Sequence, residues 1–235
     1  MWADLKLKAA NGSTGSLNER EVFSPMNIPS LSRMEANVVV LGADNVGKSA
    51  LIVRFLTRRF IGEYGDIESV YNHKVTVAGI QVAFNIWDSP FSQDRLNNNS
   101  RKEKQIQWAD GFVLVYSICD RASFNIVRQQ IQFIKSMKAY PGADRAPIVI
   151  VGNKRDLCHC RTVSSEEGRL LALATHCEFY EISAAETYHG ALVVFHGLVD
   201  IIKESKLLTI RKPAGIRSIV RSMSAVFTRR RTDSL

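Results

Sequence analysis

The fold of this chain is decided by the stretch Gly42-Ala43-Asp44-Asn45-Val46-Gly47-Lys48-Ser49, which matches the pattern G-x-x-x-x-G-K-S. An apolar run at 37–41 precedes it and predicts a buried parallel strand, and an apolar-periodic segment at 49–57 follows it and predicts a helix. In that setting the glycines let the backbone wrap closely around a phosphate group, and the loop N–H groups and the helix N-terminus supply positive potential. Lys48 adds a point charge, and the Ser49 hydroxyl is placed to ligate Mg²⁺. We therefore predict a phosphate site formed by residues 42–49 and the adjoining Ala50.

Strands and helices alternate along the rest of the chain. Further strands are predicted at 70–77, 80–87, 111–116, 148–151 and 178–182, the first two joined by a turn at Ala78-Gly79. Helical patterns are predicted at 123–137, 165–175 and 191–202. This alternation predicts an α/β fold of the doubly wound type, with a six-stranded, mostly parallel sheet, one antiparallel pair and helices on both faces. We predict one such domain over 36–206, between an unstructured arm at 1–35 and a basic tail at 207–235.

A second polar motif, Asn153-Lys154-Arg155-Asp156, follows the strand predicted at 148–151. A carboxylate at Asp156 can accept hydrogen bonds from both the N1–H and the exocyclic amine of guanine, whereas adenine lacks this donor pair. Asn153 suits the acceptor edge of the purine, and the stem of Lys154 can pack over the ring. Three further residues complete the predicted base site: Phe60, Ser183 and Ala184. Alone, the motif is also compatible with a polar turn; downstream of a phosphate loop it predicts a guanine nucleotide, GTP or GDP.

Four stretches together resemble a Ras-type small GTPase. They are the G-x-x-x-x-G-K-S loop, Arg54-Phe55-Leu56-Thr57-Arg58-Arg59-Phe60-Ile61-Gly62-Glu63-Tyr64, Trp108-Ala109-Asp110-Gly111-Phe112-Val113-Leu114-Val115-Tyr116, and Asn153-Lys154-Arg155-Asp156. The similarity spans residues 36–206 and is greatest to the branch that holds the Ras-related oestrogen-regulated growth inhibitor, its "-like" relative and the Ras-like family 11 proteins. It implies a P-loop G domain, a role in signal transduction, and binding of GTP or GDP with Mg²⁺ at Ser49 and Asp88.

The two switch segments depart from the pattern of that family. The first normally carries a threonine that ligates Mg²⁺ and senses the γ-phosphate, but this chain reads Gly65-Asp66-Ile67-Glu68-Ser69-Val70-Tyr71. The second normally reads Asp-Thr-Ala-Gly-Gln, and this chain reads Asp88-Ser89-Pro90-Phe91-Ser92. Gln93, one place late, is the candidate for positioning the attacking water in a remodelled loop. In the family, an arginine finger acting with the switch glutamine contributes roughly 10³ to 10⁵ in rate. Because Ser92 stands in place of that glutamine, we expect slow hydrolysis.

Two other positions bear on how the nucleotide is held. Asp44 stands where Ras proteins have glycine, and its carboxylate would repel the γ-phosphate and obstruct an arginine finger unless it turns to solvent. Ala185 stands where the family has a lysine after Ser183-Ala184, which predicts a weaker hold on the base.

Positive charge gathers at the C-terminal end. From Lys203 onward there are nine basic and two acidic residues, so seven of the eight net positive charges lie there. Wound at about 100° per residue, six large apolar side chains fall within a ~120° arc, which predicts a basic amphipathic helix: Ile216, Ile219, Val220, Met223, Val226 and Phe227. Residues 216–231 fit reversible contact with an anionic membrane or a calmodulin-type partner; packing back on the domain or fraying in solution is the alternative. A nearly neutral body argues against specific nucleic-acid binding.

Further features bear on location and chemistry. The sequence shows no signal peptide, no apolar run long enough to span a bilayer and no C-terminal prenylation cysteine, so we expect a cytoplasmic monomer with at most peripheral membrane contact. The four cysteines are scattered, which fits a reducing compartment. Cys158-His159-Cys160 is expected to be a surface turn rather than a metal site, because no second pair of ligands is in evidence.

Three functions are consistent with these features. The first is a Ras-like signalling protein with Mg²⁺-dependent GTP binding and slow hydrolysis. The second is a pseudo-GTPase, a scaffold whose switch loops recognise partners independently of the γ-phosphate. The third gives the active role to the basic tail, with the G domain as its carrier. Gln93 is the single catalytic candidate, for water positioning.

Overall fold

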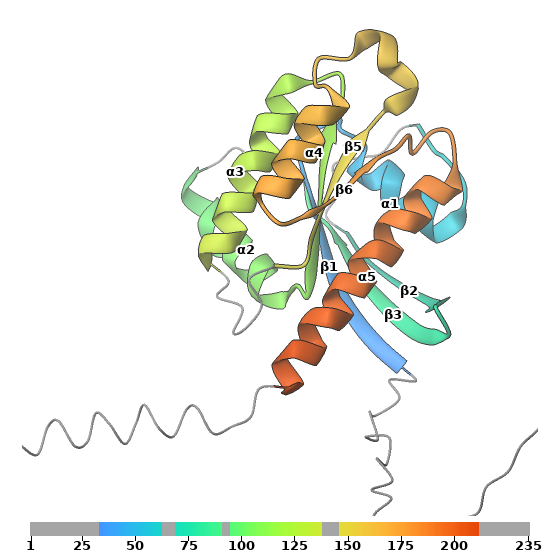
Figure 1. Cartoon of the computed structure of the whole chain (residues 1–235), viewed down its shortest axis with the longest axis vertical. Helices are drawn as coiled ribbons and strands as arrows, with labels where there is room; N and C mark the ends of the chain where they lie inside the picture. The colour runs from blue at the N-terminus through green and yellow to red at the C-terminus, as the bar shows by residue number, and fades with distance from the viewer. Residues whose placement is uncertain (1–32, 63–68, 91–94, 138–145, 212–235) are drawn as a thin grey trace, which may run out of the picture. The chain divides into compact units, whose positions relative to one another are not determined.

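A computed structural model describes residues 33–62, 69–90, 95–137 and 146–211; for 95–99 and 209–211 it describes the backbone only (Figure 1). Its centre is a six-stranded sheet in the order β2-β3-β1-β4-β5-β6. The strands are β1 (Arg33–Leu41), β2 (Ser69–Val77), β3 (Ile80–Asp88), β4 (Gly111–Ser117), β5 (Ile148–Asn153) and β6 (Glu178–Glu181). β2 and β3 pair antiparallel and all other neighbours pair parallel. The predicted α/β fold with one antiparallel pair is therefore confirmed.

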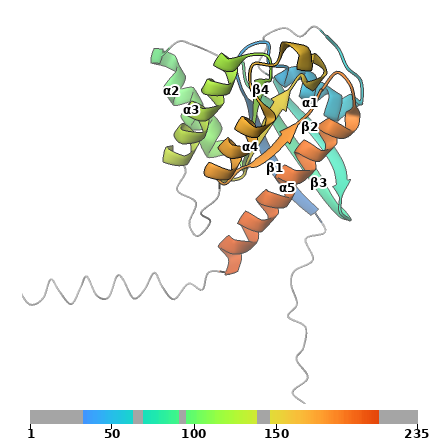
Figure 2. The ribbon, with the colours of Figure 1, turned by 45° about the horizontal axis from the view of Figure 1, so that its top comes forward.

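Helices cover both faces of the sheet, α1 and α5 on one and α2, α3 and α4 on the other (Figures 1 and 2). The helices are α1 (Lys48–Thr57), α2 (Arg95–Trp108), α3 (Arg121–Met137), α4 (Ser165–Ala174) and α5 (Tyr188–Arg211), with a 3-10 helix η1 (Arg155–Cys160). Because helices lie on both sides, β4 and β5 are buried along their whole length, and their apolar runs reflect this. On the α1–α5 face the rings of Phe55 and Phe195 stack 4.2 Å apart.

Local sequence explains where several helices begin and which side they bury. α4 starts with a capping box, in which Ser164 accepts from the Glu167 N–H and the Glu167 carboxylate accepts from the Ser164 N–H. α3 buries side chains spaced three or four residues apart, as an amphipathic helix must: Phe124, Val127, Ile131 and Ile134. Glu167 also pairs with Arg121 at the start of α3, so the two helices are joined by an ion pair.

Two element boundaries differ from the sequence prediction by four residues or more, and one helix was not predicted. β1 begins at Arg33 rather than 37, since residues 33–36 alternate exposed and buried beside β3 alone and lack the continuous apolar run. α2 was not predicted because residues 97–105 are all polar and show no apolar period; one of them, Gln105, is buried. α5 runs to Arg211, past the predicted end at 202, and Lys206 anchors this extension through the Glu35 carbonyl (3.0 Å) and Asp110 (3.2 Å).

Among the described residues, none of the helices combines the length and apolar character that crossing a bilayer demands. Residues 155–160 form η1 with every side chain exposed, which agrees with the surface turn predicted for Cys158-His159-Cys160. Of the arm predicted at 1–35, residues 33–35 belong to β1, and residues 1–32 lie outside the described residues. The amphipathic segment at 216–231 also lies outside them, as does the prediction made for it.

Candidate functional site

The phosphate loop takes a shape that only glycine permits at two positions. Gly47 has φ 93°, and a Cβ there would lie 2.4 Å from Asn153 Nδ2. A Cβ at Gly42 would lie 2.2 Å from the carbonyl oxygen of Val115 on β4. Both contacts are far below van der Waals distance, so the motif glycines are required by packing as well as by backbone conformation.

Lys48 is enclosed by the loop that it follows. Its side chain is buried, and its Nζ donates to the carbonyls of Gly42 (3.2 Å) and Ala43 (2.7 Å). Gly47 caps α1 without a side-chain hydrogen bond, so the first N–H groups of the helix point toward the space beside Lys48. A buried ammonium next to a helix N-terminus is suited to binding an anion.

A cleft of about 510 Å³ opens at this edge of the sheet, where the carboxyl ends of the parallel strands meet. This volume lies within the range of small-molecule sites. Most of the predicted site residues line it together: Asn45, Gly47, Lys48, Ser49, Ala50, Phe60, Asp88, Asn153, Lys154, Asp156, Ser183 and Ala184. Gly42, Ala43 and Val46 are buried in the loop beneath it. Sequence reasoning did not name as binding residues four others that line it: Gly62, Pro90, Leu157 and Ala185.

Asn153 braces the site in a way that the sequence did not indicate. The residue is 2% exposed, its Nδ2 donates to the Val46 carbonyl (2.8 Å), and its Oδ1 accepts from the Ala184 N–H (3.0 Å). The predicted role was contact with the acceptor edge of the purine. The structure shows that its amide also joins the phosphate loop to the loop after β6, which fixes the separation of the two ends of the cleft, and the contact with the purine stays a prediction.

The residues at the Mg²⁺ end supply suitable oxygen atoms. Asp88 is buried at the last position of β3, and Ser49 lies in the first turn of α1; both line the cleft. Across the described part of the chain, no group of three or more His, Cys, Asp or Glu residues could hold a metal by itself. One hydroxyl and one carboxylate fit Mg²⁺, which commonly takes one or two protein oxygens and completes its shell with phosphates and water.

The start of the second switch is tied to α2. Ser89 and Gln105 are both buried, and Gln105 Nε2 donates to Ser89 Oγ (2.9 Å). Beside them the rings of Trp87 and Trp108 meet edge to face at 5.3 Å. The serine that follows Asp88 is therefore held by the C-terminal half of α2.

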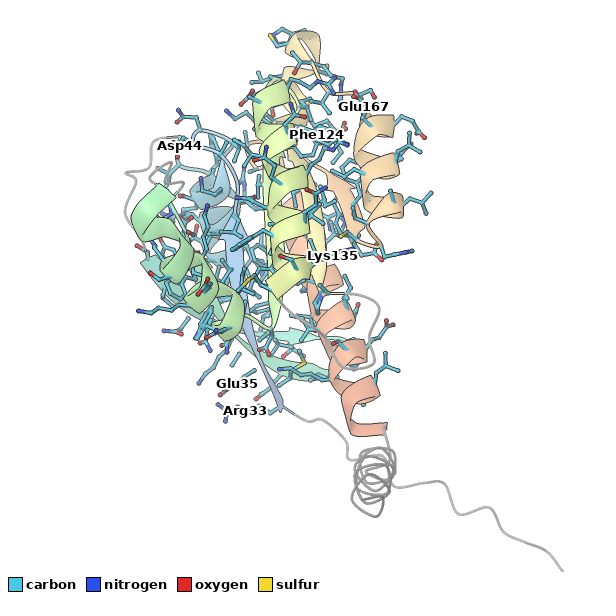
Figure 3. All side chains as sticks on the ribbon, turned by 90° about the vertical axis from the view of Figure 1, so that its left-hand side faces the viewer. Arg33, Glu35, Asp44, Phe124, Lys135 and Glu167 are labelled. Atoms are coloured by element: carbon cyan, nitrogen blue, oxygen red, sulfur yellow. The ribbon has the colours of Figure 1, made fainter. Side chains whose placement is uncertain are left out.

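Two predicted site residues remain, Asp44, which the structure describes, and Gln93, which it does not. Asp44 is exposed on the loop (Figure 3), and it does not belong to the lining; its side chain is on the solvent side, the arrangement under which it would not obstruct the γ-phosphate. Gln93, Phe91 and Ser92 lie outside the described residues, as does 63–68 of the first switch.

The fold and this cleft define a P-loop nucleotide-binding domain of the doubly wound class. A family model described as "Ras family" matches residues 37–204. The chain is 41% identical over 201 residues to the Ras-related and estrogen-regulated growth inhibitor-like protein of Bos taurus, covering 84% of this chain and 98% of that one. It is 43% identical over 188 residues to Ras-like protein family member 11A of Rattus norvegicus, covering 77% and 76%. It is 42% identical over 172 residues to Ras-like protein family member 11B of Danio rerio, covering 71% and 69%.

The chain therefore belongs to the Ras family, whose members are GTP-binding signalling proteins, and the resemblance seen in its sequence is confirmed.

Proposed function

We propose that this protein binds GTP and GDP with Mg²⁺ and hydrolyses GTP slowly. The observation that carries the proposal is the cleft itself, because the phosphate loop, Asp88 and the motif ending at Asp156 all line one space. The pair Lys48 and the α1 N-terminus would hold the phosphates, and the Asp156 carboxylate would accept from the guanine edge. Phe60 and Lys154 would flank the ring.

Ser49 and Asp88, which both line the cleft, would hold Mg²⁺. The ion would supply charge neutralisation between the phosphates when bound. The contribution of the chain is to keep the Ser49 hydroxyl at the head of α1 and the Asp88 carboxylate buried at the end of β3. Both residues belong to regular elements, Ser49 to α1 and Asp88 to β3.

Slow hydrolysis is supported by the sequence of the switches. Phosphoryl transfer depends on positioning and electrostatic stabilisation, and the family glutamine orients the attacking water. Here Phe91 replaces the glycine that meets the γ-phosphate and Ser92 replaces that glutamine. The tie between Ser89 and Gln105 further limits how far the start of this segment can move.

The first experiment is to purify the protein in Mg²⁺ buffer, denature it and identify the released nucleotide by chromatography. Bound GTP supports guanine-nucleotide binding with hydrolysis too slow to be completed during purification, and single-turnover measurement then separates slow hydrolysis from none. Bound GDP at near-full occupancy supports guanine-nucleotide binding, and single-turnover hydrolysis of loaded GTP then measures the rate. An empty cleft overturns the proposal and favours the scaffold.

The source of any residual hydrolysis can be assigned with two alanine variants. Activity that survives Ser92→Ala and disappears in Gln93→Ala would place the displaced glutamine next to the water. Equal activity in both variants would show that neither side chain positions it.

The concentration of charge after Lys203 favours a second candidate, an interaction module whose basic tail contacts an anionic membrane or an acidic partner. Since α5 ends at Arg211, deleting 213–235 leaves every described element in place. Loss of binding to vesicles containing phosphatidylserine, with nucleotide binding intact, would support this candidate. Unchanged vesicle binding would refute it.

A further inference from the structure

We propose that Arg54 is a positioning residue that closes the base end of the cleft and sets how slowly a guanine nucleotide leaves. This inference rests on the proposed function. Arg54 lies on α1, outside the cleft lining, and no part of the sequence motif for the base includes it. Its guanidinium nevertheless contacts both walls of the base end.

The first wall is the loop after β6. Arg54 Nε donates to the Ala184 carbonyl (2.8 Å), and Arg54 Nη2 donates to the Ala185 carbonyl. Both alanines line the cleft. A planar guanidinium can serve two neighbouring carbonyls at once because its donors are fixed in a fork, which neither lysine nor glutamine reproduces.

The second wall is Phe60, which lies just beyond α1. The Arg54 guanidinium carbon is 5.7 Å from the centroid of the Phe60 ring, within the range of a cation–π contact. Phe60 is 44% exposed and lines the cleft, so its orientation is not fixed by burial. Arg54 also donates through Nη1 to the Arg58 carbonyl (3.0 Å), at the left-handed turn that ends α1 and leads to Phe60.

Arg54 thus completes a brace that Asn153 begins. Asn153 Oδ1 accepts from the Ala184 N–H, and Arg54 Nε donates to the Ala184 carbonyl. The peptide units before and after Ala184 are therefore both held by side chains. The backbone position of the loop after β6 matters more for holding the base than it would if a long side chain extended over the ring, because Ala185 contributes only a methyl group. Backbone placement then determines whether the wall stays closed on the ring.

The test compares Arg54→Gln and Arg54→Lys with Arg59→Gln, which removes the same charge from an exposed residue in the same segment. The assay is the dissociation rate of GDP labelled on its ribose, in Mg²⁺ buffer and again in excess chelator. Charge-assisted hydrogen bonds are the strong ones, and we expect Arg54→Gln to raise the rate about 10-fold. Arg54→Lys should recover part of the loss, and Arg59→Gln should match the unmodified protein.

Two readouts separate positioning from general loosening of the fold. The ratio of rates with and without chelator should stay unchanged in Arg54→Gln, because the phosphate end is untouched. Inosine diphosphate, which lacks only the exocyclic amine, should be released faster by the same factor as GDP, because the Asp156 carboxylate is intact. A lowered melting temperature with an unchanged dissociation rate would overturn the inference. Failure of the unmodified protein to bind GDP at all would instead overturn the proposed function.

Discussion

Replacing Gly47 with alanine should destabilise the protein by two separable effects. The first is the positive φ of 93°, which costs an L-residue about 1–2 kcal/mol. The second is the 2.4 Å approach of the new Cβ to Asn153 Nδ2. Asn153 cannot move freely, because its side-chain amide donates to the Val46 carbonyl and accepts from the Ala184 N–H. Displacing it leaves the Val46 carbonyl without this hydrogen bond, which costs about 1–3 kcal/mol.

The expected total is about 2–5 kcal/mol, or roughly 4–20 °C in melting temperature for a chain of this size. In an Asn153→Ala background the clash is gone, so Gly47→Ala should cost only about 1–2 kcal/mol. The coupling between the two positions should therefore be about 1–3 kcal/mol. Gly79→Ala is the matched control, because Gly79 has φ 80° but nothing within 4 Å of its Cβ.

The assay is urea unfolding of the four members of this cycle and of the control, each at two concentrations of GDP so that the contribution of bound ligand can be subtracted. Additive costs for Gly47→Ala and Asn153→Ala would refute the steric argument. A cost for Gly79→Ala equal to that for Gly47→Ala would show that backbone strain alone accounts for the glycine.

Three other predictions follow from named contacts. Asp156→Asn should weaken GDP binding by about 10-fold or more and improve xanthosine diphosphate binding, because an amide can donate to the 2-oxo group of xanthine; a competition assay measures both. The pKa of Glu167 is lowered from 4.5 to about 2, chiefly by its hydrogen bond from Arg121, so the resulting stabilisation is present above pH 4.5 and lost as the pH falls toward 2; the difference in melting temperature between Glu167→Gln and the unmodified protein should shrink over that interval. Gln105→Met should cost about 1–3 kcal/mol of unfolding free energy in urea by removing the buried donor to Ser89, and adding Ser89→Ala should recover part of that cost. An equal loss in the single and the double variant would show that the hydrogen bond is not the cause.

The parts of the fold that sequence predicts well are those where one local rule governs. β4 and β5 are continuous apolar runs because both faces are covered, and the loop at Gly47 is a fixed pattern between strand and helix. α2 was not predicted because residues 97–105 are all polar. Among them, Gln105 is buried because it meets a hydrogen-bonding requirement with Ser89. That requirement exists only once the sheet has brought residue 89 beside the helix.

The same distinction holds within the site. Asp156 and Lys48 carry their chemistry in their own motifs, so sequence identifies them. Arg54 and Asn153 act through contacts with residues 130 and 31 positions away, respectively, and no spacing rule predicts such a contact. Bracing residues of this kind become visible only when the distances between loops are known.

These braces bear on how nucleotide binding and turnover are related in this chain. The phosphate loop, Asn153 and Arg54 are held by β4, β5, α1 and the loop after β6, and of the second switch the described residues Asp88 and Pro90 line the cleft. Under the proposed function, we expect the replacement of the family glycine and glutamine by Phe91 and Ser92 to slow hydrolysis while this framework keeps the cleft in place. When hydrolysis is slow, the lifetime of a bound nucleotide is set by its release. The residue that governs release, which we propose to be Arg54, then governs how long the protein stays in one nucleotide state, and a faster-releasing Arg54→Gln variant should exchange GDP for GTP faster with its single-turnover hydrolysis rate unchanged.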